Sequence, residues 1–308
     1  MSTARRSLSA EVIGKMTRRL SLVLALAATV GSASDRAHGA ETMNRLATNR
    51  LATNRLATNR LAANRLATNA LSSTRLEASS ATAELLQTAD GREVYSYIIS
   101  CALPDSLSIQ ASVPGVPDSA PPYTPYTCSG GVCVFDGSLG LADYWTDRRL
   151  DPKGQRWISA CLFARVNLYD TAEAISLRGL APSLTVGPDE GEIFTVQEGA
   201  FFGNLFADGD GPIDWNACRG RDQASGEFGG LVLRDCTEPD PNDPTKTLCG
   251  FNYAGDCADF TPDSPSPYAC RTFDAEEGTY GACHVAAGDG VWPGLRPYFE
   301  IITSYVSP

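Results

Sequence analysis

The stretch PKGQRWISACLFARVNL, from Pro152 to Leu168, decides how this chain folds. Proline suits the first turn of a helix, because the N–H that it lacks has no partner within the helix there. Trp157, Cys161, Ala164 and Leu168 recur at spacings of three or four residues, which places them on one face. The pattern therefore predicts a helix from Pro152 to about Leu168 with one apolar face that carries a cysteine.

A second helix is predicted upstream, from Asp90 to about Ala102. The sequence Asp90-Gly91-Arg92-Glu93 is typical of a capping box, in which two side chains bond free backbone N–H groups at the start of a helix. Val94, Ile98 and Cys101 share one face of that helix. Both helices thus present a cysteine, and a disulfide between Cys101 and Cys161 is predicted to join them.

The remaining elements are short and mixed. Strands are predicted at residues 106–111 and 172–177, a proline-rich loop at 113–125, and a short helix from Pro188. After residue 200, short apolar runs alternate with clusters of Gly, Pro and Asp. The predicted fold class is α+β: a single disulfide-stapled domain with N-terminal helices and a loop-rich, short-strand C-terminal half.

All ten cysteines lie in the C-terminal two thirds of the chain: Cys101, Cys128, Cys133, Cys161, Cys218, Cys236, Cys249, Cys257, Cys270 and Cys283. An even number in an exported chain predicts five disulfides. A zinc site would favour close Cys-x2-Cys pairs, and the sequence has none.

The spacing of the cysteines favours some pairings over others. Cys128–Cys133 is predicted first, because Ser-Gly-Gly-Val between them can form a tight turn. Cys270–Cys283 is a further hypothesis, and the pairing among the four cysteines at 218, 236, 249 and 257 stays open.

The N-terminus has the order of a secretory signal peptide. A basic leader precedes an apolar run of about 11 residues from Leu20 to Val30, which is short of the roughly 20 residues that span a membrane. Cleavage is expected after Ala33 or near Ala40, and Met16 is an alternative start. No cysteine lies near the cleavage region, so a lipid anchor is not expected; the general secretory route is favoured over the twin-arginine route.

A five-residue repeat follows, beginning NRLAT at Asn44, with leucines at 46, 51, 56, 61, 66, 71 and 76. A period of five scatters these leucines around a helix and alternates them between the faces of a strand. The repeat loosely resembles pentapeptide-repeat proteins, which wind a four-sided β-helix, although arginine stands where that family places Asp or Asn. A stalk and a short appended β-helix both remain open. The predicted organisation is residues 1–40 for signal and processing, 41–80 for the repeat, and 81–308 for the acidic domain.

The charge of the chain is divided unevenly. Residues 1–81 hold 12 Lys or Arg against 4 Asp or Glu, whereas residues 82–308 hold 13 against 32, so the net charges are +8 and −19. An acidic domain repels nucleic-acid phosphates and anionic membranes, which excludes a nucleic-acid partner. The expected location is secreted, periplasmic or on the cell surface, with an extracellular or envelope partner and no transmembrane span.

Two sets of residues are candidates for a site. His284 is the one histidine of the acidic domain, and a Ser-His-Asp or Cys-His arrangement would have to use it; the alternative is an ordinary surface histidine. Asp208, Asp210 and Asp214 place carboxylates at the spacing a calcium loop uses, but Pro212, Ile213 and Arg219 break the EF-hand pattern. The choice for this loop is a calcium site or a simple Asp/Gly turn, and no other cofactor is expected.

Aromatic side chains suggest a surface that binds sugars. Tyr144, Trp145, Trp215 and Trp292 would form such a face if they were exposed, whereas tryptophan is more often a core residue. With 32 acidic residues in the domain, a pair of carboxylates for glycoside hydrolysis is always available, so the sequence does not single one out.

The phrases GQRWISACLFARVN, QEGAFFGNLF and GGLVLRDC resemble a group of uncharacterised exported Cys-rich proteins of high-GC Gram-negative bacteria. The resemblance covers most of residues 85–308 and implies export but no activity. Two functions are therefore expected: first, a non-enzymatic exported or cell-surface interaction or structural protein; second, a secreted hydrolase acting on polysaccharide or peptide.

Overall fold

The structure is a computed structural model. It describes residues 40–44, 46–47, 70–71, 80–121, 124–169, 173–206, 214–222, 235–258, 268–285 and 297–308. In that part of the chain, no helix combines the length and the apolar character needed to cross a membrane.

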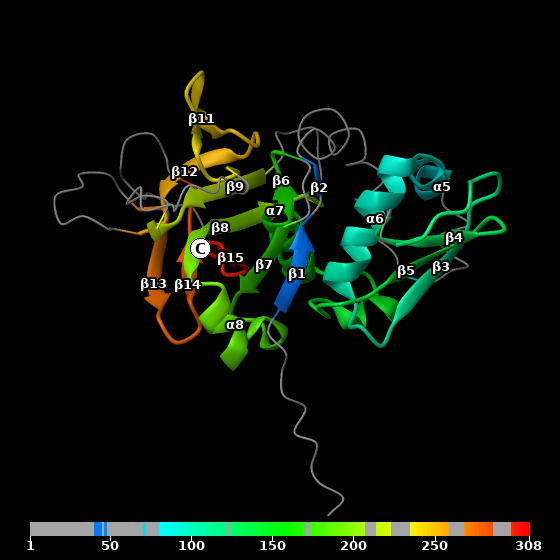
Figure 1. Cartoon of the computed structure of the whole chain (residues 1–308), viewed down its shortest axis with the longest axis horizontal. Coiled ribbons are helices and arrows are strands. Elements are labelled where there is room, and N and C mark those ends of the chain that lie inside the picture. The colour runs from blue at the N-terminus through cyan, green and yellow to red at the C-terminus, as the bar shows by residue number, and fades with distance from the viewer. Residues whose placement is uncertain are drawn as a thin grey trace, which may run out of the picture. The chain divides into compact units, whose positions relative to one another are not determined.

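An eight-stranded mixed sheet is the centre of the domain, in the order β1-β7-β15-β8-β9-β12-β11-β10 (Figure 1). Its strands are β1 (Ala40–Asn44), β7 (Glu173–Arg178), β8 (Val196–Asn204), β9 (Asp214–Arg219), β10 (Pro239–Asp240), β11 (Asp243–Thr247), β12 (Asn252–Asp256) and β15 (Ile302–Val306). Only the β9–β12 pairing is parallel among these neighbours. The α+β class is confirmed.

The prediction of a loop-rich C-terminal half with short strands is wrong. β8 runs for nine residues, and β15 lies between β7 and β8 although it comes last in the chain. Thr303 of β15 pairs with Arg178 on one side and with Ala200 on the other. Most residues of these strands are buried on both faces, so the strands lack the alternation of buried and exposed positions that marks a strand exposed on one side.

Both faces of β8 are covered. Phe201 and Ala217 belong to the core on the side of helix α7 (Pro152–Ala164), which packs against β8 and β15 (Figure 1). Ala200 and Phe202 belong to a second core that includes Tyr280. That second core lies under the hairpin of β13 (Cys270–Asp274) and β14 (Thr279–Cys283). Consecutive residues of β8 thus face opposite cores, as the alternation of a strand requires.

Helix α7 begins as predicted and ends early. Pro152 occupies its first turn, and the carboxylate of Asp151 accepts a hydrogen bond of 2.8 Å from the N–H of Gly154, which caps the helix. The helix ends at Ala164, four residues before the predicted Leu168. Residues 166–167 instead form β6 (Val166–Asn167), paired in parallel with β2 (Leu46–Ala47).

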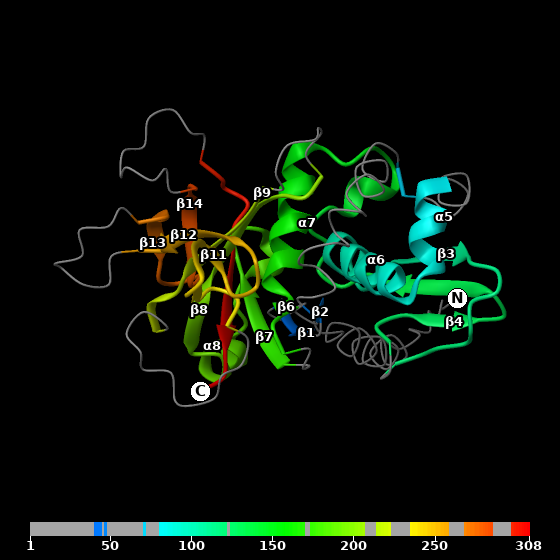
Figure 2. The ribbon, with the colours of Figure 1, turned by 90° about the horizontal axis from the view of Figure 1, so that it is seen from above.

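Helix α6 (Ala89–Ala102) matches the second predicted helix, with a different cap. The hydroxyl of Thr88, rather than Asp90, accepts the N–H of Gly91 at 3.0 Å. The predicted capping box was therefore placed two residues too late. Helix α5 (Ser80–Gln87) precedes it and packs against it (Figure 2).

A three-stranded sheet, in the order β3-β5-β4, packs on α6. Its strands are β3 (Ser108–Ser112), β4 (Thr127–Ser129) and β5 (Val132–Asp136). The ring of Phe135 meets the ring of Tyr95 edge-on, with centroids 4.7 Å apart. Three short elements complete the order: η1 (Asp143–Thr146), η2 (Pro182–Leu184) and the short helix α8 (Pro188–Ile193), which confirms the helix predicted from Pro188.

All ten cysteines are described, and all form disulfides. The pairs are Cys101–Cys161, Cys128–Cys133, Cys218–Cys257, Cys236–Cys249 and Cys270–Cys283. The first joins α6 to α7, and the second and fifth link directly opposite residues of the β4–β5 and β13–β14 hairpins. The pairings predicted for Cys101, Cys128 and Cys270 are present, and the four cysteines left open form two pairs.

Among the described residues between 40 and 71, β1, β2 and Leu71 contact the domain. β1 pairs antiparallel with β7 from Ala40 opposite Leu177 to Asn44 opposite Glu173. β2 pairs with β6, and Leu71 is 3 % exposed in the main core, with its N–H donating to the carbonyl of Trp145 at 2.8 Å. The other predictions about the signal and the repeat lie outside the described residues.

Candidate functional site

A half-open cleft of about 480 Å³ lies at the start of α7. Its walls come from three segments that are distant in the sequence: residues 140–148 around η1, residues 151–157 at the start of α7, and residues 180–183 after β7. Tertiary packing brings these segments together, and the chain is crowded at Gly179, the residue after β7. A Cβ on Gly179 would lie 2.8 Å from Cδ1 of Leu184, 2.9 Å from the carbonyl oxygen of Ile301 and 3.3 Å from the ring of Trp157, so a glycine allows this approach.

Asp151 and Tyr144 are linked in one wall of the cleft. The Tyr144 hydroxyl donates to Oδ1 of Asp151 at 2.8 Å, and the same oxygen accepts the N–H of Gly154. Partial burial acts to raise the pKa of Asp151, but the hydrogen bonds from Gly154 and Tyr144 outweigh it and lower that pKa. Burial and the hydrogen bond to Asp151 raise the pKa of Tyr144. At neutral pH the pair is therefore a carboxylate held by a neutral phenol.

Two cations line the same cleft. The guanidinium of Arg148 lies over the Tyr144 ring, 4.3 Å from its centroid, which is a cation–π contact. Lys153 lies in the first turn of α7, and both cationic side chains are exposed to solvent. With Asp151 as the one carboxylate among the described lining residues, the lining carries a net positive charge.

The remaining wall is apolar. Trp157 is 6 % exposed and Leu180 is 52 % exposed, and Leu141, Ala181 and Pro182 complete the lining on this side. A concave apolar surface with a few placed polar groups is the usual form of a small-molecule binding site. The cleft combines such a surface with two cations.

The described lining of the cleft has few groups that carry out acid–base or nucleophilic chemistry. It contains neither a histidine nor a cysteine, and Oδ1 of its single carboxylate already accepts two hydrogen bonds. Glycoside hydrolysis generally needs two carboxyl groups on either side of the bond, and acyl transfer needs a nucleophile beside a base. These groups do not converge in the described part of the cleft.

His284 lies elsewhere and is not a surface histidine. It is 7 % exposed, directly after Cys283, and its backbone N–H donates to the carbonyl of Ala269 at 2.7 Å. Burial, together with the charge of nearby Arg271, lowers the pKa of His284. The alternative of a surface histidine is therefore wrong, because the β13–β14 hairpin holds this residue at the edge of the second core.

The predicted calcium loop is described only at its end. Asp208 and Asp210 lie outside the described residues. Asp214 begins β9, and its carboxylate accepts hydrogen bonds from the Tyr298 hydroxyl and, at 2.8 Å, from the amide of Asn216. Calcium binding here stays a hypothesis.

The predicted aromatic face does not form as a unit. Trp145 is fully buried, Trp215 packs against the core beside Phe251, and Trp292 lies outside the described residues. Of the three whose structure is described, Tyr144 alone lines the cleft. Trp157, which the sequence assigned to a helix face, also lines the cleft, although it is largely buried.

Four residues that line the cleft were not identified as site candidates from the sequence: the charged residues Arg148, Asp151 and Lys153, and the apolar residue Leu180. The only local signal was Asp151 before Pro152, which is a good N-cap, and a cap residue is ordinarily structural.

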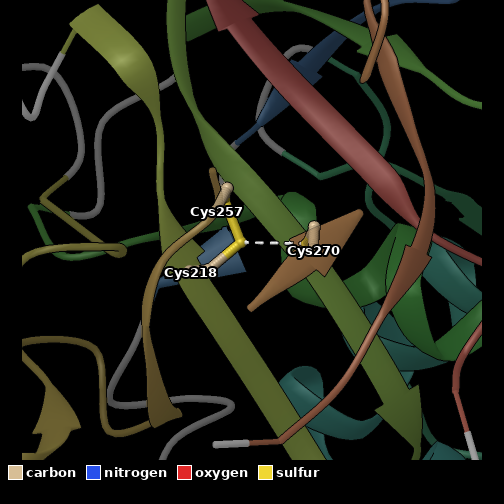
Figure 3. A group of neighbouring side chains, drawn as sticks. All are labelled: Cys218, Cys257 and Cys270. Atoms are coloured by element: carbon tan, nitrogen blue, oxygen red, sulfur yellow. Dashed lines mark hydrogen bonds between the residues drawn. A yellow bond between two sulfur atoms is a disulfide. The ribbon is translucent and has the colours of Figure 1, made fainter. Parts of the chain in front are cut away.

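Three sulfur atoms also form a cluster at a spacing that suits a metal, in Cys218, Cys257 and Cys270 (Figure 3). Each of them is already bonded in a disulfide, so none is the thiolate that binds a metal.

Comparison with protein-family models, curated protein sequences and solved structures gave no match to this chain.

Proposed function

We propose that this chain is an exported, non-enzymatic binding module whose cleft at the start of α7 binds an acidic saccharide. The observation that carries the proposal is the charge of the lining. Arg148 and Lys153 both border the cleft, although residues 82–308 carry a net charge of −19. A positive cleft in an acidic domain attracts an anion while the rest of the surface repels it, which favours binding at this one place.

The saccharide is inferred from the other walls. The cleft is lined by the partly exposed ring of Tyr144, the largely buried Trp157 and the exposed Leu180. This apolar surface, with the Tyr144 hydroxyl as its polar edge, suits a ring that has both C–H and O–H groups. Asp151 and Ser183 supply further hydrogen-bonding groups at the rim. Arg148 supplies the planar, bidentate donor that fits a carboxylate, and its stacking on Tyr144 holds it in place.

Export and location are part of the proposal. The leader predicted at residues 1–40 and five disulfides support a secreted, periplasmic or cell-surface protein. The repeat between the leader and the domain would then act as a spacer or an attachment segment. The secreted hydrolase is less favoured, because the described lining has one carboxylate.

Isothermal titration of the full mature chain with trigalacturonate tests the proposal, with neutral maltotriose as the matched ligand. We expect measurable binding of the acidic trisaccharide only. Arg148→Ala should weaken it by about tenfold or more, since a charged hydrogen bond contributes about 1.5–3 kcal/mol.

The control is Arg149→Ala, which removes the same charge from the neighbouring exposed residue outside the lining. We expect this variant to bind as the wild type does. Equal losses for Arg148 and Arg149, or equal binding of the neutral sugar, would refute the role of the cleft. Release of reducing ends from polygalacturonate would favour the hydrolase instead.

A further inference from the structure

Two disulfides of the second core lie side by side. Cys218–Cys257 joins β9 to the residue after β12, and Cys270–Cys283 links β13 to β14. The Sγ atoms of Cys218 and Cys270, which belong to different disulfides, are 3.6 Å apart (Figure 3). Together with Cys257, the three sulfur atoms lie within 4.8 Å of one another.

The surroundings of the sulfur atoms are closed and apolar. Cys218, Cys257 and Cys283 are fully buried and Cys270 is 4 % exposed, and their core neighbours include small alanine side chains. A thiolate formed on Cys218 would therefore have the sulfur of Cys270 in contact, whereas a thiol from solvent would reach this core slowly. Proximity of this kind makes an intramolecular step far faster than its bimolecular equivalent.

We propose that Cys218 and Cys270 form an internal thiol–disulfide exchange site, through which these two disulfides trade partners. An external dithiol first reduces the Cys218–Cys257 disulfide and is itself oxidised to a disulfide. This reduction leaves a thiolate on Cys218. The Cys218 thiolate then attacks Sγ of Cys270. The Cys218–Cys270 bond forms, the Cys270–Cys283 bond breaks, and the electron pair leaves on Cys283 as a thiolate.

The exchange is balanced without a further oxidant, because one disulfide and one thiolate are present before and after it. In the reverse step the Cys283 thiolate attacks Sγ of Cys270, the Cys218–Cys270 bond breaks, and the electron pair leaves on Cys218. A Cys218–Cys270 disulfide formed during oxidative folding is also resolved when the Cys257 thiolate attacks Cys218, which forms the native Cys218–Cys257 pair and leaves a thiolate on Cys270. The site thus lets four cysteines from three parts of the chain reach their native pairing within the core, and this inference is independent of the ligand of the cleft.

The test is the full-length variant Cys257→Ser, which leaves a thiol on Cys218. The protein is held in native buffer, quenched in acid, unfolded, alkylated and mapped without reduction. We expect alkylation of both Cys218 and Cys283, together with a Cys218–Cys270 cross-linked peptide. The rate at which label appears on Cys283 should rise about tenfold per pH unit below pH 8, because the thiolate is the attacking species.

Two further variants keep the test decisive. Cys283→Ser leaves the thiol on Cys270 and is expected to release Cys257 by the reciprocal attack on Cys218. Cys249→Ser is the matched control, since the sulfur of its freed partner Cys236 contacts the carbonyl oxygen of Val166 at 3.4 Å. In this control variant the alkylation label should stay on Cys236.

Label confined to Cys218 in the first variant and to Cys270 in the second would overturn the proposal. Scrambling of the control to the same extent would overturn it too, because exchange would then reflect general unfolding. If either variant fails to fold, limited reduction of the wild-type protein by dithiothreitol replaces it. A Cys218–Cys270 peptide among the partly reduced species supports the proposal, and its absence there refutes it.

Discussion

Replacing Cys101 and Cys161 together by alanine should lower the free energy of unfolding by about 4 kcal/mol. This disulfide closes a separation of 60 residues, and the loss of chain entropy in the unfolded state grows with the logarithm of that number. The same relation gives about 2 kcal/mol for Cys128–Cys133, whose separation is 5 residues. The prediction is therefore a difference of about 2 kcal/mol between two double variants of the same chemistry.

The comparison isolates the length of the loop. Cys101, Cys133 and Cys161 are fully buried and Cys128 is 2 % exposed, so both double variants remove two buried sulfur atoms and leave two alanine methyl groups. The losses from packing should be similar and cancel in the difference. What remains is the restriction that each disulfide places on the unfolded chain.

Urea denaturation followed by tryptophan fluorescence measures both losses, with the slopes compared to check that the transitions stay two-state. In a domain of this size, about 4 kcal/mol should lower Tm by roughly 8–16 °C. Equal losses for the two variants, or a larger loss for the short loop, would refute the reasoning. That outcome would mean that packing, and not chain entropy, decides what these disulfides contribute.

Three other variants test the fold. Trp145→Ala should cost about 3–5 kcal/mol in a denaturation experiment, because the indole is fully buried in the main core; a loss below about 1 kcal/mol would contradict that packing. Gly203→Ala should destabilise the domain by about 1–3 kcal/mol, since Gly203 has φ +143° and an added Cβ would meet the carbonyl oxygen of Asp214; an unchanged Tm would argue against this backbone. His284→Asn should reduce the loss of stability between pH 8 and pH 5. Burial lowers the pKa of His284 in the folded state, so the unfolded state binds the proton better and wild-type stability falls as pH drops below about 6.5. A urea midpoint with the same pH dependence in wild type and variant would show that other groups are responsible.

Local signals in the sequence predicted the helices well. Pro152 and the spacing of the apolar residues after it identified α7, and Pro188 identified α8. These signals are local because a helix is held together by hydrogen bonds and contacts between residues three or four apart. The end of α7 was predicted too late for a tertiary reason. The residues after Ala164 satisfy the helical period, but Val166 pairs with β2 instead.

The cleft was beyond prediction from the sequence. Tyr144, Trp157 and Leu180 each fit an ordinary structural role in their own segment, and only the tertiary packing of η1, α7 and the segment after β7 makes them neighbours. The same holds for Cys218 and Cys270, which are 52 residues apart and meet through the layering of a hairpin on the sheet. Neither the spacing of residues along the chain nor the amino-acid composition predicts such long-range contacts.

The sequence by itself determined the properties that depend on composition and on near neighbours: an acidic cysteine-bearing domain, two disulfide-linked helices, and the tight pair Cys128–Cys133. Tertiary structure alone decided the strand order, in which β15 enters between β7 and β8, and with it the position of the cleft. The physical reason is the range of the forces involved. Helix caps and short loops are stabilised by contacts within a few residues, whereas a strand buried on both faces is selected by the whole sheet and by the two cores that cover it.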